Sequence, residues 1–130
     1  MKDIAKAVEH HQKVLGYVLT SEIVFDPLQK VRVAMLRHPE HNEVGLELVE
    51  PASDDAPVVN YLKKNVHLYQ IAYEVLNVEE TLARARANGA IIISHPKPSV
   101  LFGGRRIAFI FTPDGYIVEF VENPELPREA

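Results

Sequence analysis

The same order of secondary-structure signals occurs twice along this chain of 130 residues. In the first half, Asp3 caps a predicted helix over residues 3–15 that Gly16 ends. Extended segments rich in Val, Ile and Leu follow at residues 17–25, 30–37 and 43–50. In the second half, a predicted strand over 66–75 leads to a helix over 78–87, which Asn77 caps and Gly89 ends. Predicted strands then follow at residues 90–94, 105–111 and 116–122.

Local sequence matches support a duplication. VRVAML at residues 31–36 corresponds to RRIAFI at 105–110, and ELVEP at 47–51 corresponds to EFVENP at 119–124. Each half reads as β-α-β-β-β, except that the first begins at its helix, so its opening strand is predicted to be absent. We expect one α+β domain over residues 1–130, with module 1 at about 1–56 and module 2 at about 66–124.

Composition narrows the functions that are open to this chain. The net charge is −4 and no extended run of Lys or Arg occurs, which argues against nucleic acid or a membrane surface as partner. No apolar stretch approaches the roughly 20 residues that cross a bilayer, so a cytoplasmic location is expected. Because cysteine is absent, any metal ion would need histidine, carboxylate or amide ligands.

Three segments in this order give the chain a family resemblance: ELVEP at residues 47–51, QIAYEV at 70–75 and GRRIAF at 104–109. With them, the chain resembles the vicinal oxygen chelate superfamily of glyoxalases, bleomycin-resistance proteins and dioxygenases. The methylmalonyl-CoA epimerase and lactoylglutathione lyase-like branches are the most similar. The resemblance implies that each module curls a mixed sheet into a cup. It also implies a divalent metal ion held by one residue from the first and last strand of each module.

Carried over by position, the resemblance puts the two last-strand ligands at Glu47 and Glu119. The first-strand ligand of module 2, usually histidine in the family, falls on Gln70, whose amide coordinates more weakly than an imidazole. The fourth ligand would precede Met1, and a start codon further upstream is the alternative explanation. In the epimerase-like branch, a carboxylate that acts as the base in proton transfer occupies the position where this chain has Val33. The candidates for proton transfer in this chain are therefore Glu119 and Glu74.

Side-chain alternation predicts which way these strands face. The polar candidates Glu47, Gln70, Glu74 and Glu119 are expected on the sheet faces away from the helices. The apolar residues of opposite parity are expected to pack beneath the helices. They are Val44, Leu46, Leu48, Tyr69, Ile71, Tyr73, Val75, Val118 and Phe120.

The histidines are assigned mostly structural roles. His11 is predicted to pack on the apolar stripe of the first helix, with His10 on the surface. His38 and His41 flank a turn and are interpreted as a chance surface pair. Parity places His67 on the helix side of its strand, so it is not expected to replace Gln70 as a ligand.

The resemblance favours a metal-assisted lyase or isomerase that acts on a small 2-oxo acid, thioester or thiohemiacetal. The alternative is a non-catalytic module of the bleomycin-resistance kind, which binds a small molecule in the same cup and has a degraded metal site. A module without its first strand leaves a sheet edge unpaired, and unpaired edges favour association, so a homodimer is expected.

Overall fold

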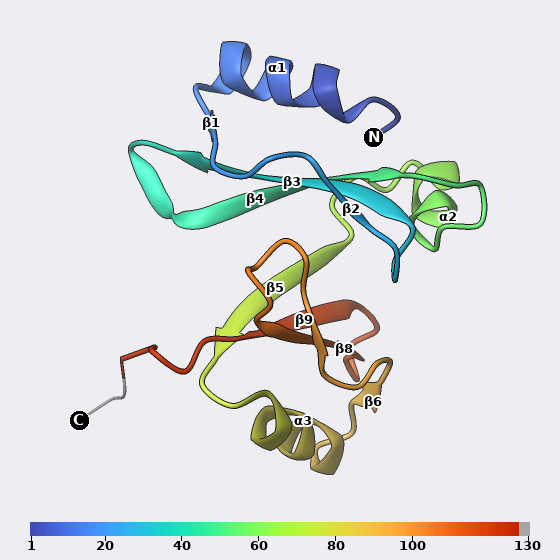
Figure 1. The fold of residues 1–130 in the computed structure, drawn as a ribbon. Coiled ribbons are helices and arrows are strands. Elements are labelled where there is room, and N and C mark those ends of the chain that lie inside the picture. The colour runs from blue at the N-terminus through green and yellow to red at the C-terminus, as the bar shows by residue number, and fades with distance from the viewer. Residues whose placement is uncertain (128–130) are drawn as a thin grey trace. The chain divides into compact units, whose positions relative to one another are not determined.

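The computed structural model describes residues 1–127, with the side chain of residue 42 left aside. The chain divides into two compact units, of which the first is Met1–His67 and the second begins at Leu68. Each unit has its own sheet and its own helix packed on that sheet (Figure 1). Among the described residues, no helix is both long and apolar enough to cross a membrane.

In the first unit, helix α1 (Ile4–Leu15) begins and ends as its sequence predicts. The Asp3 side chain accepts a hydrogen bond from the Lys6 N–H, and Gly16 ends the helix in the left-handed conformation, at φ 77°. The apolar stripe of α1 buries Ile4 and Val8 against the sheet. His11 is half-buried and His10 exposed, as expected.

The sheet of the first unit is antiparallel. Strands β3 (Val31–His38) and β4 (His41–Pro51) form a long hairpin, and β1 (Val18–Leu19) and β2 (Val24–Asp26) pair with the other edge of β3. The single strand predicted over 17–25 is therefore wrong, because residues 20–23 leave the ladder between two short strands. Along its free edge, β4 pairs with no strand of the described chain, and Met1 donates its ammonium N–H to the Val49 carbonyl at 3.1 Å.

After the short helix α2 (Val58–Lys63), the second unit repeats this plan with its first strand present. Strand β5 (Gln70–Val75) pairs in parallel with β9 (Ile117–Glu122), which is antiparallel to β8 (Arg106–Phe111). Strands β6 (Ile91–Ile92) and β7 (Lys97–Pro98) both pair with β8. Only β6 was predicted, and at greater length. The predicted strand over 66–75 begins four residues later than expected.

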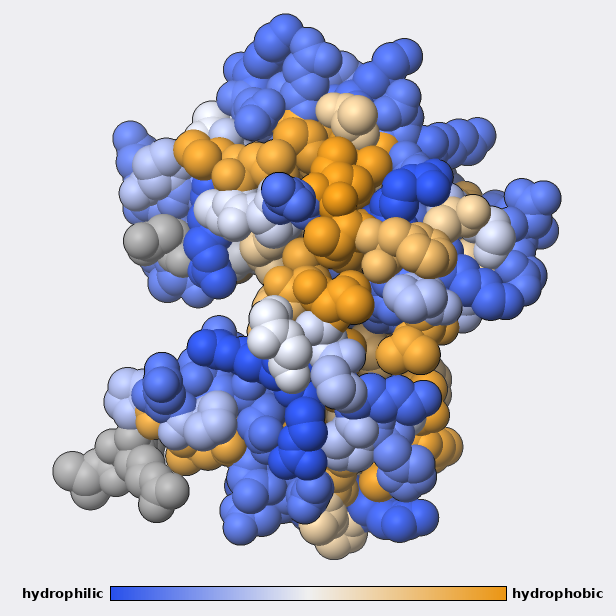
Figure 2. All heavy atoms as spheres, viewed as in Figure 1, coloured by the Kyte–Doolittle hydropathy of each residue, from blue (hydrophilic) through white to orange (hydrophobic). Residues whose placement is uncertain are grey.

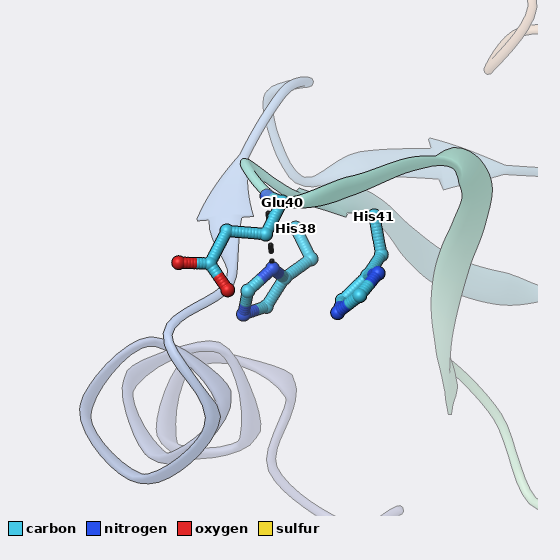
Figure 3. Close-up of side chains that lie close together, drawn as sticks. All are labelled: His38, Glu40 and His41. Atoms are coloured by element: carbon cyan, nitrogen blue, oxygen red, sulfur yellow. Dashed lines mark hydrogen bonds between the residues drawn. The ribbon is translucent and has the colours of Figure 1, made fainter.

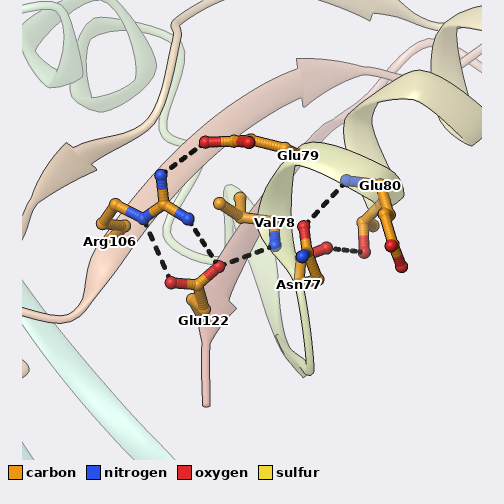
Figure 4. Close-up of polar contacts among 7 residues, drawn as sticks. Asn77, Val78, Glu79, Glu80, Arg106 and Glu122 are labelled. Atoms are coloured by element: carbon orange, nitrogen blue, oxygen red, sulfur yellow. Dashed lines mark hydrogen bonds and ion pairs between the residues drawn. The ribbon is translucent and has the colours of Figure 1, made fainter. Parts of the chain in front are cut away.

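Helix α3 (Val78–Ala87) begins at Asn77, whose side chain accepts a hydrogen bond from the Glu80 N–H (Figure 4). It packs over β6, β8 and β9 and buries Val78 and Leu82. The expected packing beneath the helices is confirmed for Leu46, Leu48, Val75, Val118 and Phe120.

That expectation is wrong for Val44, Ile71 and Tyr73, each of which is at least half exposed. The alternation of side chains along a strand decides which sheet face a residue lies on. It does not decide whether a helix covers that residue, because a helix of ten residues is only about 15 Å long and does not reach every strand. Val44 lies beside a register shift at the end of the hairpin. Ile71 and Tyr73 lie on the edge strand β5, whose last residue, Val75, packs against the core beneath α3.

Candidate functional site

Glu47 lies in the middle of β4, on the sheet face away from α1. Its neighbours Leu46 and Leu48 pack toward the helix, so alternation turns Glu47 the other way, as predicted. The residue across the ladder is Met35. Glu47 is thus a partly buried carboxyl group in an otherwise apolar strand.

The electrostatic surroundings of Glu47 make it a weak acid. Burial, together with the negative charge of Asp26, raises the pKa of Glu47 to about 7. Asp26 is itself buried, and its oxygens accept hydrogen bonds from the backbone N–H of Leu28 and from the Gln29 side chain at 2.9 Å. At neutral pH the proton on Glu47 is therefore easily gained and lost.

Glu119, the equivalent residue of the second unit, is the most buried of the candidates. It lies in the middle of β9 with 3% of its surface exposed, and its neighbours Val118 and Phe120 pack toward α3. Its partners across the ladders are Ala72 on β5 and Phe109 on β8.

Gln70 lies at the start of β5, opposite Ile117, and is partly buried. Because partners across a ladder share a face and successive residues alternate, Gln70 and Glu119 lie on the same face, one two-residue step apart. The structure therefore brings these two predicted ligands together within the second unit.

Glu74 shares that face but has different surroundings. It lies opposite Val121 at the far end of β5, where it is exposed and accepts a hydrogen bond from the Asn123 side chain at 2.9 Å. Glu74 is thus a solvated carboxylate on the same face as Gln70 and Glu119. Glu47 belongs to the first unit and these three residues to the second.

The four candidates offer only oxygen donors, a set that suits a hard divalent cation such as Mg²⁺ or Mn²⁺. No imidazole belongs to this set. The expectation that His67 lies on the helix side of its strand is wrong, because β5 begins at Gln70 and His67 precedes it. His67 is exposed, with Nε2 3.0 Å from the side-chain oxygen of Asn65.

Two features of the first unit were not anticipated from the sequence. One is Asp26, whose negative charge contributes to the raised pKa of Glu47. The other is that the side chain of Glu40 lies close to those of His38 and His41. One potential metal-binding atom from each of these three residues lies within 4.8 Å of the other two. The signal was present as His-Pro-Glu-His, with the histidines at the two ends of a two-residue turn.

The two units are related: each packs a helix on one face of its sheet and has a buried or partly buried glutamate in its last strand, and only the second has a strand before that helix. The sequence pattern of the glyoxalase/bleomycin resistance protein/dioxygenase superfamily matches residues 1–109, and the chain belongs to this superfamily.

Among curated proteins, the chain is 32% identical over 129 residues to a lactoylglutathione lyase of Salmonella typhimurium and 30% identical over 129 residues to one of Escherichia coli O157:H7. Each match covers 97% of this chain and 89% of the enzyme. Among solved structures, a variant of Streptomyces coelicolor methylmalonyl-CoA epimerase in complex with 2-nitronate-propionyl-CoA is 26% identical, with a TM-score of 0.78. That match covers 94% of this chain and 90% of the epimerase. The Mycobacterium tuberculosis methylmalonyl-CoA epimerase has a TM-score of 0.82 at 23% identity, over 98% of this chain and 83% of the epimerase, and shows the shared fold alone.

Proposed function

We propose that the protein is a metal-assisted lyase or isomerase that removes a proton from the carbon beside a carbonyl group. The relatives are named for lactoylglutathione and methylmalonyl-CoA, and both compounds are thioesters with a hydrogen on that carbon. A small thioester, 2-oxo acid or thiohemiacetal is therefore the proposed substrate class.

The observation that carries this proposal is the raised pKa of Glu47, at about 7. Burial and the Asp26 charge destabilise the carboxylate form of Glu47, and a divalent cation beside it would stabilise that form. We propose Glu47 in the first unit, and Gln70 and Glu119 in the second, as ligands for divalent cations. When bound, such a cation would polarise the substrate carbonyl and stabilise an enolate.

Proton transfer is proposed for Glu119 and Glu74, the two carboxyl groups that share a sheet face in the second unit. Glu74 suits a base because it is exposed and its carboxylate accepts a hydrogen bond from a neutral amide, that of Asn123. Glu119 is buried in the middle of β9, on the same sheet face as Glu74.

A second function is favoured by Gln70. A neutral amide is a weaker ligand than the imidazole that the family usually has at this position, so the metal site can be degraded. In that case the same residues would serve a non-catalytic module that binds a small molecule, as bleomycin-resistance proteins do. The two functions differ in whether a bound thioester exchanges its α-proton with water.

The experiment is therefore proton exchange in D₂O. Methylmalonyl-CoA and lactoylglutathione are incubated with the protein and Mg²⁺, Mn²⁺, Co²⁺ or Ni²⁺, and deuterium at the α-carbon is followed by NMR. We expect exchange that Glu119→Gln slows by about 100-fold or more. Glu43→Gln is the matched control, because Glu43 is exposed near the start of β4 and should leave the rate unchanged. Binding of either thioester without exchange would contradict the enzyme and favour the binding module.

A further inference from the structure

The turn between β3 and β4 brings two imidazole rings close together. Strand β3 ends at His38 and β4 begins at His41, and these two residues are partners across a turn of Pro39 and Glu40. Directly opposed residues have their Cβ atoms about 5 Å apart. The ring centroids of His38 and His41 are accordingly 5.2 Å apart, with 35° between the ring planes (Figure 3).

Glu40 adds a carboxylate to the two rings. Its side chain leaves the turn on the side of the His38 ring, as Figure 3 shows, and one ligand atom from each of the three residues lies within 4.8 Å of the others. Two imidazoles and one carboxylate are donors that Zn²⁺ and neighbouring transition-metal ions take, and three such ligands leave a coordination position for water. Glu40 and His41 are exposed, so an ion can reach them from solvent.

The surrounding side chains hold His38 in place. Its ring meets Tyr17 edge to face, with centroids 5.4 Å apart, and Tyr17 in turn meets His11 at 6.2 Å. The Nδ1–H of His11 donates to the Ala7 carbonyl at 2.7 Å, which fixes that ring to α1. Gly16 lies against the far side of His38, where an added Cβ would be 3.3 Å from Nε2. One ligand of the set is therefore positioned before any ion arrives.

We propose that His38, Glu40 and His41 form a binding site for a first-row transition-metal ion such as Zn²⁺, separate from Glu47, Gln70 and Glu119. The site lies wholly within the first unit. It has nitrogen donors, whereas the other set has only oxygen donors, so the two sets favour different ions.

Binding at this site has a definite cost. The backbone N–H of Glu40 donates to Nδ1 of His38 at 3.1 Å. An ion must either take this lone pair or bind Nε2, whose proton would then move to Nδ1. Either route breaks the Glu40 hydrogen bond and so weakens binding.

The test is a calorimetric titration of the full chain with Zn²⁺ at neutral pH, using His41→Ala, Glu40→Gln and His10→Ala. We expect one zinc ion per chain to bind tightly, and affinity to fall about tenfold or more in His41→Ala and by less in Glu40→Gln. His10→Ala, an exposed histidine of the same unit, should bind as the parent does. Circular dichroism confirms that each variant is folded.

Two results would overturn the proposal. One is a parent chain that takes up no zinc, and the other is a His41→Ala variant that binds as tightly as the parent. NMR signals of the histidine rings give a second readout, because zinc should shift those of His38 and His41 and leave that of His10 in place. Glu47→Gln should retain this zinc site, so failure here is distinguishable from failure of the proposed function.

Discussion

The carboxylate of Glu50 accepts a hydrogen bond of 2.6 Å from the backbone N–H of Ile4, the first residue of α1. Glu122 makes the equivalent contact with Val78, the first residue of α3, at 3.0 Å. Each glutamate also pairs with an arginine of the neighbouring strand, Arg32 for Glu50 and Arg106 for Glu122. A last-strand carboxylate thus binds the positive end of the helix in both units.

The first prediction concerns this helix contact. Hydrogen bonds from Arg106, and then from the Val78 N–H, hold the pKa of Glu122 below its ordinary value. Glu122→Gln should therefore lower the free energy of unfolding by about 1–3 kcal/mol, measured by urea denaturation at pH 7. Because the pKa of Glu122 is lowered in the folded state, its carboxylate stabilises the folded protein at pH values above 4.5, the ordinary pKa of glutamate. The loss of unfolding free energy caused by Glu122→Gln should therefore shrink as the pH falls below 4.5.

Glu79→Gln is the matched control, since Glu79 binds the same arginine from an exposed position (Figure 4). Its effect should stay within about 0.5 kcal/mol. Equal effects of the two substitutions would show that the contact with α3 adds nothing to stability.

The second prediction concerns the acidity of Glu47. The pKa of Glu47 is about 7 in the folded state, against 4.5 for an ordinary glutamate. Between pH 4.5 and 7, Glu47 therefore binds a proton more strongly in the folded protein than in the unfolded protein. Stability should therefore fall as the pH rises from 4.5 to 7, by at most about 3 kcal/mol. Water around this partly exposed group reduces that limit.

Glu47→Gln removes the titrating group and should flatten this pH dependence. The variant should match the parent near pH 4 and exceed it in unfolding free energy near pH 8, as measured by thermal and urea unfolding without metal. Glu43→Gln, on the same strand but exposed, should follow the parent throughout. A Glu47→Gln variant with the pH profile of the parent would mean that Glu47 has an ordinary pKa.

The third prediction separates backbone strain from crowding at Gly16. Gly16 and Gly103 both have positive φ, at 77° and 62°, so alanine at either position should cost about 1 kcal/mol in unfolding free energy. Of these two glycines, only Gly16 lies where a new Cβ would meet a side chain, that of His38, at 3.3 Å. Gly16→Ala should thus destabilise more than Gly103→Ala and should shift the NMR signals of the His38 ring. Equal stabilities and an unmoved His38 would contradict this close packing.

The fourth prediction is that the chain forms a homodimer. One edge of β4 pairs with no strand in the described part of the chain, and strand edges of this kind favour association. Apolar side chains are also exposed along β1 and β2, where Figure 2 shows hydrophobic atoms on the surface of the first unit. They are Val18, Ile23, Phe25 and Leu28. Sedimentation velocity at micromolar concentration should give twice the mass of one chain, and a monomer would contradict the prediction.

Local signals allowed much of the fold to be predicted from the sequence. Asp3 and Asn77 fix the helix starts through contacts three residues away, and alternation fixes the facing of Glu47 and Glu119. The division of residues 17–25 into two strands could not be predicted, because it depends on pairing with β3.

The same limit applies to the candidate sites. Asp26 accepts its hydrogen bonds from residues only two and three positions along the chain, but its effect on Glu47 depends on a sheet that joins distant residues. The cluster of His38, Glu40 and His41 depends on the turn being two residues long, whereas the predicted strands ended at residue 37 and resumed at residue 43.

The central claim to test is the proposal that Gln70 and Glu119, which share a sheet face in the second unit, are ligands of one metal ion. The most direct measurement is cobalt binding to Gln70→His, made in a His41→Ala background so that the turn site does not contribute. Because imidazole is a stronger ligand than an amide, affinity should rise by roughly tenfold or more, and the d-d spectrum of bound cobalt should show a nitrogen ligand. Glu119→Gln in the same background should remove this gain. An unchanged affinity and an unchanged cobalt spectrum in Gln70→His would contradict the claim.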